Sequence, residues 1–189
     1  MFKFITFIAF LITPVAFAGT TIQKSDIVQA FYQTNVVKLG SKFPFSPSYS
    51  LTNIHVIGDI QNYQQKFILN SHCDAALIPE KNKEEDLPTF QKSKLGEEVL
   101  MYGHPGARSE ELEVKAKIIG YSILKDFNYT KNCKLAVVNA KVYQGMSGGP
   151  VYNKQGEVIG MILGTSKTKT ESYFIPMEEI ADFLLANNR

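Results

Sequence analysis

Short segments rich in Val, Ile, Tyr and Phe recur about every ten residues along this chain, and turn residues separate most of them. Because no long helical pattern alternates with these segments, they favour an all-β sandwich or barrel over a layered α/β fold. We expect strands at residues 35–39, 66–69, 75–78, 98–102, 114–121, 135–140, 150–152, 158–163 and 173–175. After Pro176 the apolar period changes, since Met177, Ile180 and Leu184 fall on one helical face. This change predicts a closing α-helix over residues 177–188.

The N-terminal segment has the pattern of an export signal. Lys3 is followed by an almost uninterrupted apolar run over residues 4–18, and Ala16-Phe17-Ala18 forms a small-residue cleavage motif before Gly19. The run is short for a membrane span, so an uncleaved anchor is the weaker alternative. We therefore expect a signal peptide at residues 1–18 and a mature domain over residues 19–189, secreted or periplasmic and without stable membrane association.

The charge balance gives no sign of a polyanionic partner. Lys and Arg total 20 against 18 for Asp and Glu, a formal net charge of +2, and 44% of the 189 residues are hydrophobic. This composition is typical of a globular chain without the broad basic surface that binds a phosphate backbone. We expect no nucleic-acid partner. A polar run over residues 80–94 indicates a solvated connection between two halves of the strand pattern.

Cys73 and Cys133 are the two cysteines of the chain. Export to an oxidising compartment permits a disulfide between them. Spacing in the sequence does not show whether their backbones approach each other closely enough, so a bridge and two buried free thiols both stay open.

The motif Gly-Met-Ser-Gly-Gly-Pro at residues 145–150 carries most of the chemical information. Glycine at position 145 allows a backbone conformation in which the N–H groups of Gly145 and Ser147 converge on one point. Two converging donors stabilise the oxyanion that forms when a hydroxyl attacks a carbonyl carbon. Ser147 is thus a candidate nucleophile. It needs a neighbouring base, and imidazole is the side chain best suited to that task near neutral pH.

All three histidines, His55, His72 and His104, precede Ser147. The Gly-x-Ser-x-Gly spacing also fits the nucleophile elbow of α/β-hydrolases, but that fold places its histidine after the serine. An acid, histidine, serine order that begins at Asp26 would need an α/β sheet of subtilisin type, which this sequence does not predict. The order histidine, acid, serine remains.

Three motifs in that order resemble the trypsin-like (chymotrypsin-fold) serine endopeptidases. The segment LTNIHV at residues 51–56 resembles the one that presents their catalytic histidine, and DAALI at residues 74–78 resembles the strand that carries their aspartate. The motif around Ser147 resembles their nucleophile turn. Two further segments, at residues 96–105 and at 156–160 with 174–176, are similar to compact bacterial HtrA-type and glutamyl-endopeptidase-like members without a PDZ domain.

The resemblance implies two packed six-stranded β-barrels and a C-terminal α-helix, with the first barrel at about 27–80 and the second at about 95–176. It also implies a serine endopeptidase that hydrolyses polypeptide substrates through an acyl-enzyme intermediate. In the implied catalytic triad Ser147 attacks, His55 transfers the proton and Asp74 orients the imidazole. The N–H groups of Gly145 and Ser147 would form the oxyanion hole. No cofactor and no metal are implied.

Several residues stay as alternatives to this triad. His72 lies two residues before Asp74 and is the rival base, whereas His104 is most simply a turn residue. Asp59 and Asp86 are the alternative acids, and both lie in polar surroundings. The alternative function is a catalytically inactive, peptide-binding double barrel, which has no physical reason to keep all three triad groups.

Substrate preference depends, by the same resemblance, on two segments. Ile162, Leu163, Gly164 and Thr165 would pair with the substrate backbone and wall the primary pocket, and residues 141–144 would line its opposite side. The apolar side chains in the first segment predict a small or medium apolar residue before the scissile bond. Met146 stands where many digestive relatives have an aspartate that pairs with a newly cut N-terminus, so we expect no activation by that salt bridge.

Overall fold

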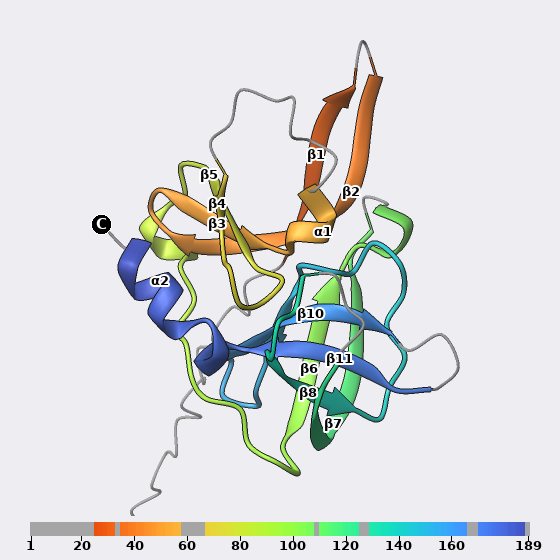
Figure 1. Cartoon of the computed structure of the whole chain (residues 1–189). Coiled ribbons are helices and arrows are strands. Elements are labelled where there is room, and N and C mark those ends of the chain that lie inside the picture. The colour runs from red at the N-terminus through yellow and green to blue at the C-terminus, as the bar shows by residue number, and fades with distance from the viewer. Residues whose placement is uncertain are drawn as a thin grey trace, which may run out of the picture.

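The computed structural model describes residues 25–32, 35–57, 67–107, 110–124, 129–165 and 170–187 of the chain. The predicted signal peptide at 1–18 and Asp59 lie outside these residues. The described chain is mostly β, with two halves packed together and a short helix near the C-terminal end (Figure 1). Each predicted strand segment overlaps an observed strand, whereas β1 (Asp26–Tyr32) and β3 (Tyr49–Thr52) are strands that the sequence pattern does not predict.

The C-terminal half is a closed barrel in the strand order β10-β11-β8-β7-β6-β9. Its strands are β6 (Glu98–Gly103), β7 (Leu112–Ile123), β8 (Lys134–Val138), β9 (Pro150–Tyr152), β10 (Val158–Thr165) and β11 (Ser172–Pro176). Inward side chains fill the barrel, and Met101, Ile118, Ile159 and Phe174 are almost completely buried there. The predicted second barrel of six strands is therefore confirmed.

The N-terminal half is a five-stranded antiparallel sheet in the order β1-β2-β3-β5-β4. Besides β1 and β3 it contains β2 (Asn35–Ser46), β4 (Ile68–Leu69) and β5 (Ala76–Pro79). Within the described residues this sheet is open, because β1 and β4 remain unpaired edges and β4 contributes a single two-residue ladder. The prediction of a six-stranded first barrel is thus not confirmed.

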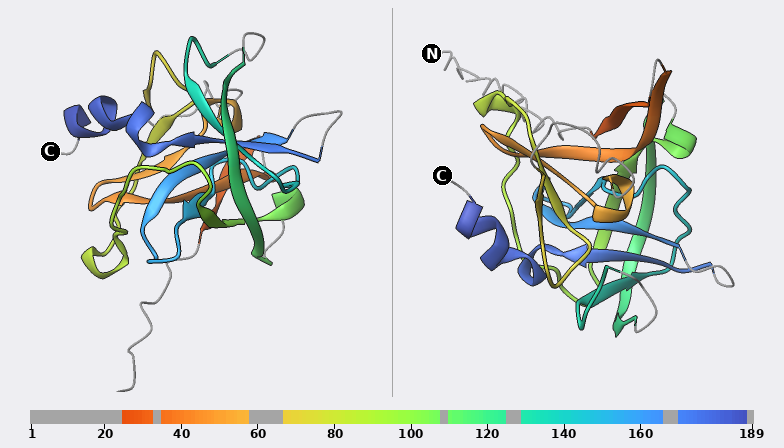
Figure 2. Two further views of the ribbon diagram at one scale, coloured as in Figure 1. Left: turned by 90° about the horizontal axis from the view of Figure 1, so that it is seen from below. Right: turned by 45° about the horizontal axis from the view of Figure 1, so that its top comes forward.

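A continuous apolar core joins the two halves, which lie against each other in both views of Figure 2. Phe43, Leu51 and Leu77 of the sheet are fully buried in one cluster with Leu135 and Ile175 of the barrel. At about 25 cal/mol for each square ångström of apolar surface removed from water, such a cluster makes separation of the halves strongly unfavourable. The two halves therefore present one rigid boundary between them.

A disulfide crosses the same boundary. Cys73, just before β5, is bonded to Cys133, just before β8, with the two Cα atoms 5.3 Å apart and both residues fully buried. The bridge joins positions 60 residues apart in the sequence. It ties the segment that leads into β5 directly to the barrel.

The helical segments are short. α1 (Ile54–Ile57) is one turn after β3, η2 (Glu84–Asp86) lies in the polar connection, and η3 (Pro105–Ala107) follows β6. The predicted helix at 177–188 divides into a 3₁₀ turn, η4 (Met177–Glu179), and α2 (Ala181–Asn187), so its α-helical part begins later than expected. None of the helices among the described residues has the length and apolar character needed to cross a bilayer.

Candidate active site

His55 and Asp74 lie together at the boundary between the two halves. The His55 backbone N–H donates to Asp74 Oδ1 at 3.0 Å, and the His55 ring contacts Asp74 Oδ2 through Nδ1. Asn53 holds the backbone of the same residue, because its Nδ2 donates to the Asp74 carbonyl oxygen at 2.8 Å. The Asp74 side chain is fully buried while that of His55 is 30% exposed, so a buried carboxylate orients an imidazole at the surface.

Ser147 lies close to α1, the turn that carries His55. Gly40 separates them, since a Cβ on this glycine would approach the Val56 Cγ atoms at 2.9 Å and the Ser147 carbonyl oxygen at 3.0 Å. Any larger residue at position 40 would push the serine and the histidine segment apart. The glycine thus permits the close approach on which a shared site depends.

The turn around Ser147 has the positive φ angles that favour glycine at two positions, Gly145 at 95° and Gly148 at 85°. Within the turn, Met146 N–H donates to the Tyr143 carbonyl at 3.0 Å and Gly149 N–H donates to the Met146 carbonyl at 3.0 Å. Among the described residues the N–H groups of Gly145 and Ser147 donate to no acceptor. These are the two donors that the sequence predicts for an oxyanion hole.

Bonds from both halves fix this turn. From the sheet, Ser41 N–H on β2 donates to the Ser147 carbonyl oxygen at 2.8 Å. From the barrel, Gly148 N–H donates to the Ile162 carbonyl at 2.9 Å, and Ile162 N–H donates to the Gly149 carbonyl at 2.8 Å. The turn is therefore anchored on both sides of the boundary.

The Ser147 hydroxyl donates to the Leu163 carbonyl oxygen at 3.0 Å. Leu163 sits at a bulge in β10, where the pairing with β11 shifts between Ile162 and Gly164. Bulges of this kind turn backbone groups away from the regular ladder and are common beside active sites. Here the bulge directs a carbonyl at the candidate nucleophile.

The predicted substrate-binding residues divide by exposure along β10. Ile162 and Leu163 are almost completely buried in apolar clusters, so their side chains pack inside the protein. Gly164 is half-buried and Thr165 is exposed. Across from them, Val142 is buried and its N–H donates to Ser172 Oγ at 2.8 Å, while Tyr143 is exposed. Any contact of Ile162 and Leu163 with a peptide would therefore involve their backbone.

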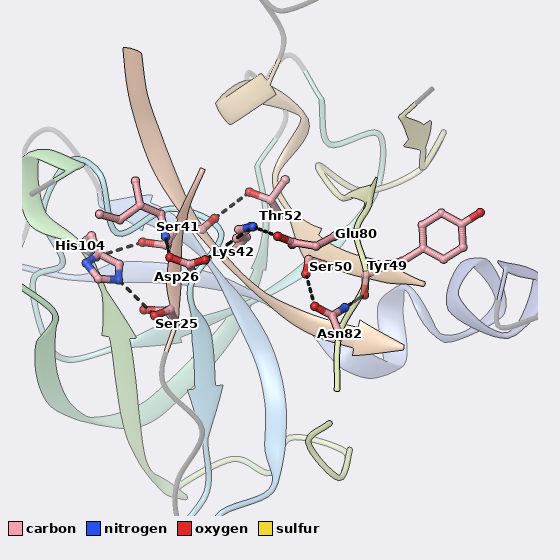
Figure 3. Close-up of polar contacts among 11 residues, drawn as sticks. Ser25, Asp26, Ser41, Lys42, Tyr49, Ser50, Thr52, Glu80, Asn82 and His104 are labelled. Carbon is pink, nitrogen blue, oxygen red and sulfur yellow. Dashed lines mark hydrogen bonds and ion pairs between the residues drawn. The ribbon is translucent and has the colours of Figure 1, made fainter. Parts of the chain in front are cut away.

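The alternative residues have other surroundings. His72 is exposed, and its Nε2 lies 3.8 Å from Glu179 Oε2. Asp86 lies on the exposed η2, and Asp26 lies on the surface 3.6 Å from Lys42 Nζ. His104, expected as a simple turn residue, is instead 6% exposed, and its Nε2 lies 3.2 Å from the Ser25 carbonyl (Figure 3).

One group of side chains has the spacing of a metal site: ligand atoms of His72, Cys73 and Glu179 lie within 4.8 Å of one another. The Cys73 sulfur is bonded to Cys133 and cannot act as a thiolate ligand. Two remaining ligands, one of them largely exposed, do not make a structural or catalytic metal site.

Two tyrosines of the barrel lie near the turn. Burial raises the pKa of Tyr102 and Tyr152 well above the ordinary value of 10.0, and Glu113, which accepts the Tyr102 hydroxyl at 2.6 Å, raises the pKa of Tyr102 further. The two rings meet edge to face with their centroids 5.7 Å apart. Both hydroxyls stay neutral over the pH range in which an imidazole titrates.

Ser41 is the residue of the site that sequence reasoning missed. It is fully buried and bonds to the turn through its backbone and its side chain. A single serine on a β-type segment carries no motif, and its partners lie more than 100 positions away in the sequence. The buried glycine before it, Gly40, is the only local signal of a close backbone approach.

The chain has relatives among known proteins. A model of the trypsin-like peptidase domain matches residues 70–161. A serine protease HtrA-like from Staphylococcus aureus (strain bovine RF122 / ET3-1) is 27% identical over 159 residues, which make up 70% of this chain and 20% of that protein. The chain spans 20% to 28% of the length of the first curated relatives that it matches.

Solved structures agree in fold. The active form of the Rv3671c protease from M. tuberculosis has a TM-score of 0.70 at 21% identity, covering 89% of this chain and 82% of that one. The HtrA-type protease AlgW with a decapeptide has a TM-score of 0.67 at 16% identity, covering 86% of this chain and 62% of the other. The chain is thus similar in sequence to the trypsin-like peptidase domain and to an HtrA-like serine protease, and similar in fold to solved proteases of this kind.

Proposed function

We propose that this chain is an exported serine endopeptidase in which Ser147, His55 and Asp74 form the catalytic triad. The observation that carries the proposal is the pairing of the fully buried Asp74 carboxylate with the partly exposed His55 imidazole. Gly40 lies between the segment that carries His55 and the turn of Ser147. Such an arrangement has a large desolvation cost for the carboxylate and no evident role in packing. A catalytic role for this pair of side chains accounts for the cost of burying the carboxylate.

The proton path follows from the tautomer that the Asp74 contact favours. With Nδ1–H of His55 donating to Asp74, the lone pair on Nε2 is the base. The Ser147 hydroxyl turns from the Leu163 carbonyl to Nε2, loses its proton there and forms a bond to the substrate carbonyl carbon. The imidazolium then gives that proton to the leaving amine, and water releases the acyl group from Ser147 by the same steps.

The oxyanion hole would consist of the N–H groups of Gly145 and Ser147. Both donors are unpaired among the described residues, and the positive φ of Gly145 supports their convergence. A preorganised donor of this kind contributes roughly 3–4 kcal/mol to the transition state when measured by removal.

Polypeptides are the substrates that this site favours. The HtrA-type protease AlgW, which shares the fold, has been solved with a decapeptide. In our proposal the backbone of Leu163, Gly164 and Thr165 pairs with the substrate. The preference for a small or medium apolar residue before the scissile bond rests on the sequence resemblance, since the side chains of Ile162 and Leu163 pack inside the protein. Cleavage of a peptide library after Glu or Arg instead would overturn this specificity.

Export and the two-barrel architecture belong to the same proposal. A buried disulfide between Cys73 and Cys133 is stable in an oxidising compartment, which supports a secreted or periplasmic location for the mature chain. We expect the signal peptide to be cleaved after Ala18, and mass spectrometry of the exported protein tests this. The open sheet is the part that would complete the first barrel.

A fluorophosphonate probe tests the proposal, because it reacts only with an activated serine. The mature protein is treated beside Ser147→Ala and beside Ser48→Ala, which removes an exposed hydroxyl in a turn of the same half as His55. We expect stoichiometric labelling of the wild type and of Ser48→Ala, and none of Ser147→Ala. Folded wild-type protein without label would contradict catalysis and favour the peptide-binding alternative.

A further inference from the structure

Four consecutive carbonyl oxygens of the nucleophile turn each accept a hydrogen bond. Two of the donors are supplied by one residue of the sheet, Ser41, and one by the turn η3. The pairs are Gly106 N–H to Gln144 O at 2.6 Å, Ser41 Oγ to Gly145 O at 2.9 Å, Gly149 N–H to Met146 O at 3.0 Å and Ser41 N–H to Ser147 O at 2.8 Å. Only the third of these bonds is internal to the turn.

The orientation of the oxyanion donors follows from these bonds. In a trans peptide the N–H and the preceding C=O point in opposite directions. When Gly106 holds the Gln144 carbonyl, the Gly145 N–H must therefore point away from η3. In the same way, the bond from the Gly149 N–H to the Met146 carbonyl makes the Ser147 N–H point away from Gly149.

The peptide between these two is the one that the Ser41 side chain holds. Its carbonyl, on Gly145, accepts Ser41 Oγ, and its N–H, on Met146, donates to Tyr143. Because Gly145 has no side chain and a φ of 95°, the local backbone does not prevent rotation of this peptide, and these two hydrogen bonds hold it. Rotation of the Gly145–Met146 peptide would turn the N–H groups of Gly145 and Ser147 away from their common point.

The Ser41 hydroxyl also connects the turn to η3. It accepts the His104 N–H at 3.0 Å (Figure 3). It also donates to the Gly145 carbonyl, and His104 stands two residues before Gly106. The hydroxyl is fully buried, so water cannot replace either bond. Met146, at the position of the aspartate in digestive relatives, is buried in the barrel core and offers no ionic anchor.

We propose that Ser41 is a positioning residue of the oxyanion hole, whose hydroxyl fixes the Gly145–Met146 peptide and couples it to η3. The proposal rests on the proposed function. It predicts that loss of the hydroxyl weakens stabilisation of the oxyanion more than it weakens substrate binding. It also gives this chain a polar clamp where digestive relatives use a salt bridge to a new N-terminus.

The test compares Ser41→Ala with Ser50→Ala in the mature protein. Ser50 is a matched control, since it is 1% exposed on the neighbouring strand β3 and donates to Asn82 Oδ1 at 3.3 Å, away from the turn (Figure 3). Turnover of a peptide ester is measured per active site titrated with the fluorophosphonate. We expect kcat to fall roughly 10- to 100-fold for Ser41→Ala with KM within about twofold, less than the 10²–10³ for deleting a donor. Ser50→Ala should keep the wild-type kcat.

A second readout isolates the oxyanion. A peptidyl trifluoromethyl ketone forms a hemiketal with Ser147, and fluorine NMR follows the ionisation of its oxygen with pH. Two well-placed donors lower the pKa of the hemiketal oxygen because they stabilise its charged form. This pKa should therefore rise in Ser41→Ala, where the donors are less well placed, and stay unchanged in Ser50→Ala. Ser41→Cys, which keeps a weak donor of similar size, should give intermediate values and replaces Ser41→Ala if that variant does not fold.

Two outcomes would overturn the proposal, and they are distinguishable. If the wild type is active and Ser41→Ala keeps its kcat and hemiketal pKa, the positioning role is wrong while the peptidase remains. If the folded wild type neither labels nor hydrolyses the ester, the proposed function fails and the role of Ser41 fails with it.

Discussion

The two halves of the molecule hold their parts of the site in different ways. The C-terminal barrel is closed by six strands around its own core, and it presents Ser147 on a turn fixed by backbone bonds. Among the residues that the structure describes, the N-terminal half is an open sheet with a smaller core of its own, and it presents His55 on the one-turn helix α1. His55 is held by the Asp74 side chain through its ring and its backbone N–H, whereas the turn of Ser147 is held mainly by bonds between backbone groups and by the Ser41 hydroxyl.

This difference assigns separate tasks to the two halves. A closed barrel has no unpaired edge, so it gives the nucleophile turn a rigid support. The open sheet contributes orientation through Asp74, and the disulfide at the preceding residue, Cys73, fastens that contribution to the barrel. Variants of Asp74 test the orientation of His55, and variants of the disulfide and of the two cores test the support of the site.

Among the variants that compare the two halves, the largest effect is expected from Asp74→Asn. The amide cannot hold the His55 tautomer that leaves Nε2 basic, so kcat should fall by about 10⁴ with little change in folding. Steady-state hydrolysis of a peptide ester and circular dichroism measure the two quantities. Asp86→Asn, a carboxylate-to-amide change on the exposed η2, should keep full activity. Equal losses in both variants would exclude Asp74 as the orienting acid.

Removal of the disulfide tests how the halves are fastened. We expect the double variant Cys73→Ser and Cys133→Ser to lose about 2–5 kcal/mol of unfolding free energy, since the bridge closes a long loop. Urea denaturation followed by circular dichroism gives the value. Wild-type protein in reducing buffer should approach the urea midpoint of the double variant. An unchanged midpoint for both would mean that the apolar boundary alone holds the halves together.

A cavity should lower the free energy of unfolding more in the barrel core than in the core of the sheet. Met101→Ala in the closed barrel should cost about 2–5 kcal/mol, because the surrounding strands cannot collapse onto the space. Ile78→Ala in β5, next to the short edge strand β4, should lie at the lower end of that range, since a sheet edge relaxes more easily. Chemical denaturation of the two variants provides the comparison. A larger loss at Ile78 would reverse our assignment of the rigid half.

The smallest effect concerns alkaline pH and belongs to the barrel. The pKa values of Tyr102 and Tyr152 are raised in the folded state, mainly by burial, so their protonated forms favour folding. This contribution is fully present below the unfolded value of 10.0 and is lost as the pH rises above it toward the folded values. Absorbance titration should find that Tyr102 and Tyr152 ionise above the ordinary value of 10.0. Ionisation of both tyrosines at that ordinary value in the folded protein would contradict the prediction.

Sequence patterns predicted the strands of the barrel well because these strands are short segments rich in Val, Ile, Tyr and Phe, and β9 and β10 are buried almost throughout. They missed the extension of β2 beyond residue 39, which contains Pro, Ser and Lys, and β3, which contains Ser; these residues are typical of turns and surfaces. They also missed β1, DIVQAFY, which contains none of these residues. The late start of α2 has a local cause, since Met177 to Glu179 form a 3₁₀ turn after Pro176. Local periodicity does not resolve such a boundary.

The candidate site divides in the same way. His55, Asp74 and Ser147 stand in recognisable motifs, so their chemistry is visible in the sequence. Ser41 and Gly106 act through backbone partners that are distant along the chain, and a hydrogen bond to a carbonyl has no residue signature. Motifs therefore identify the groups that react, while the groups that position them require the folded structure.

The acyl-enzyme at Ser147 is the most direct test of the account. The mature protein is mixed rapidly with a nitrophenyl ester of an acylated, small apolar amino acid, and the quenched protein is weighed and mapped by mass spectrometry. We predict a burst of one nitrophenolate per protein and one acyl group on Ser147, with turnover reduced by about 10⁶ in Ser147→Ala. Folded wild-type protein that gives no burst, or that carries the acyl group on another residue, would contradict it.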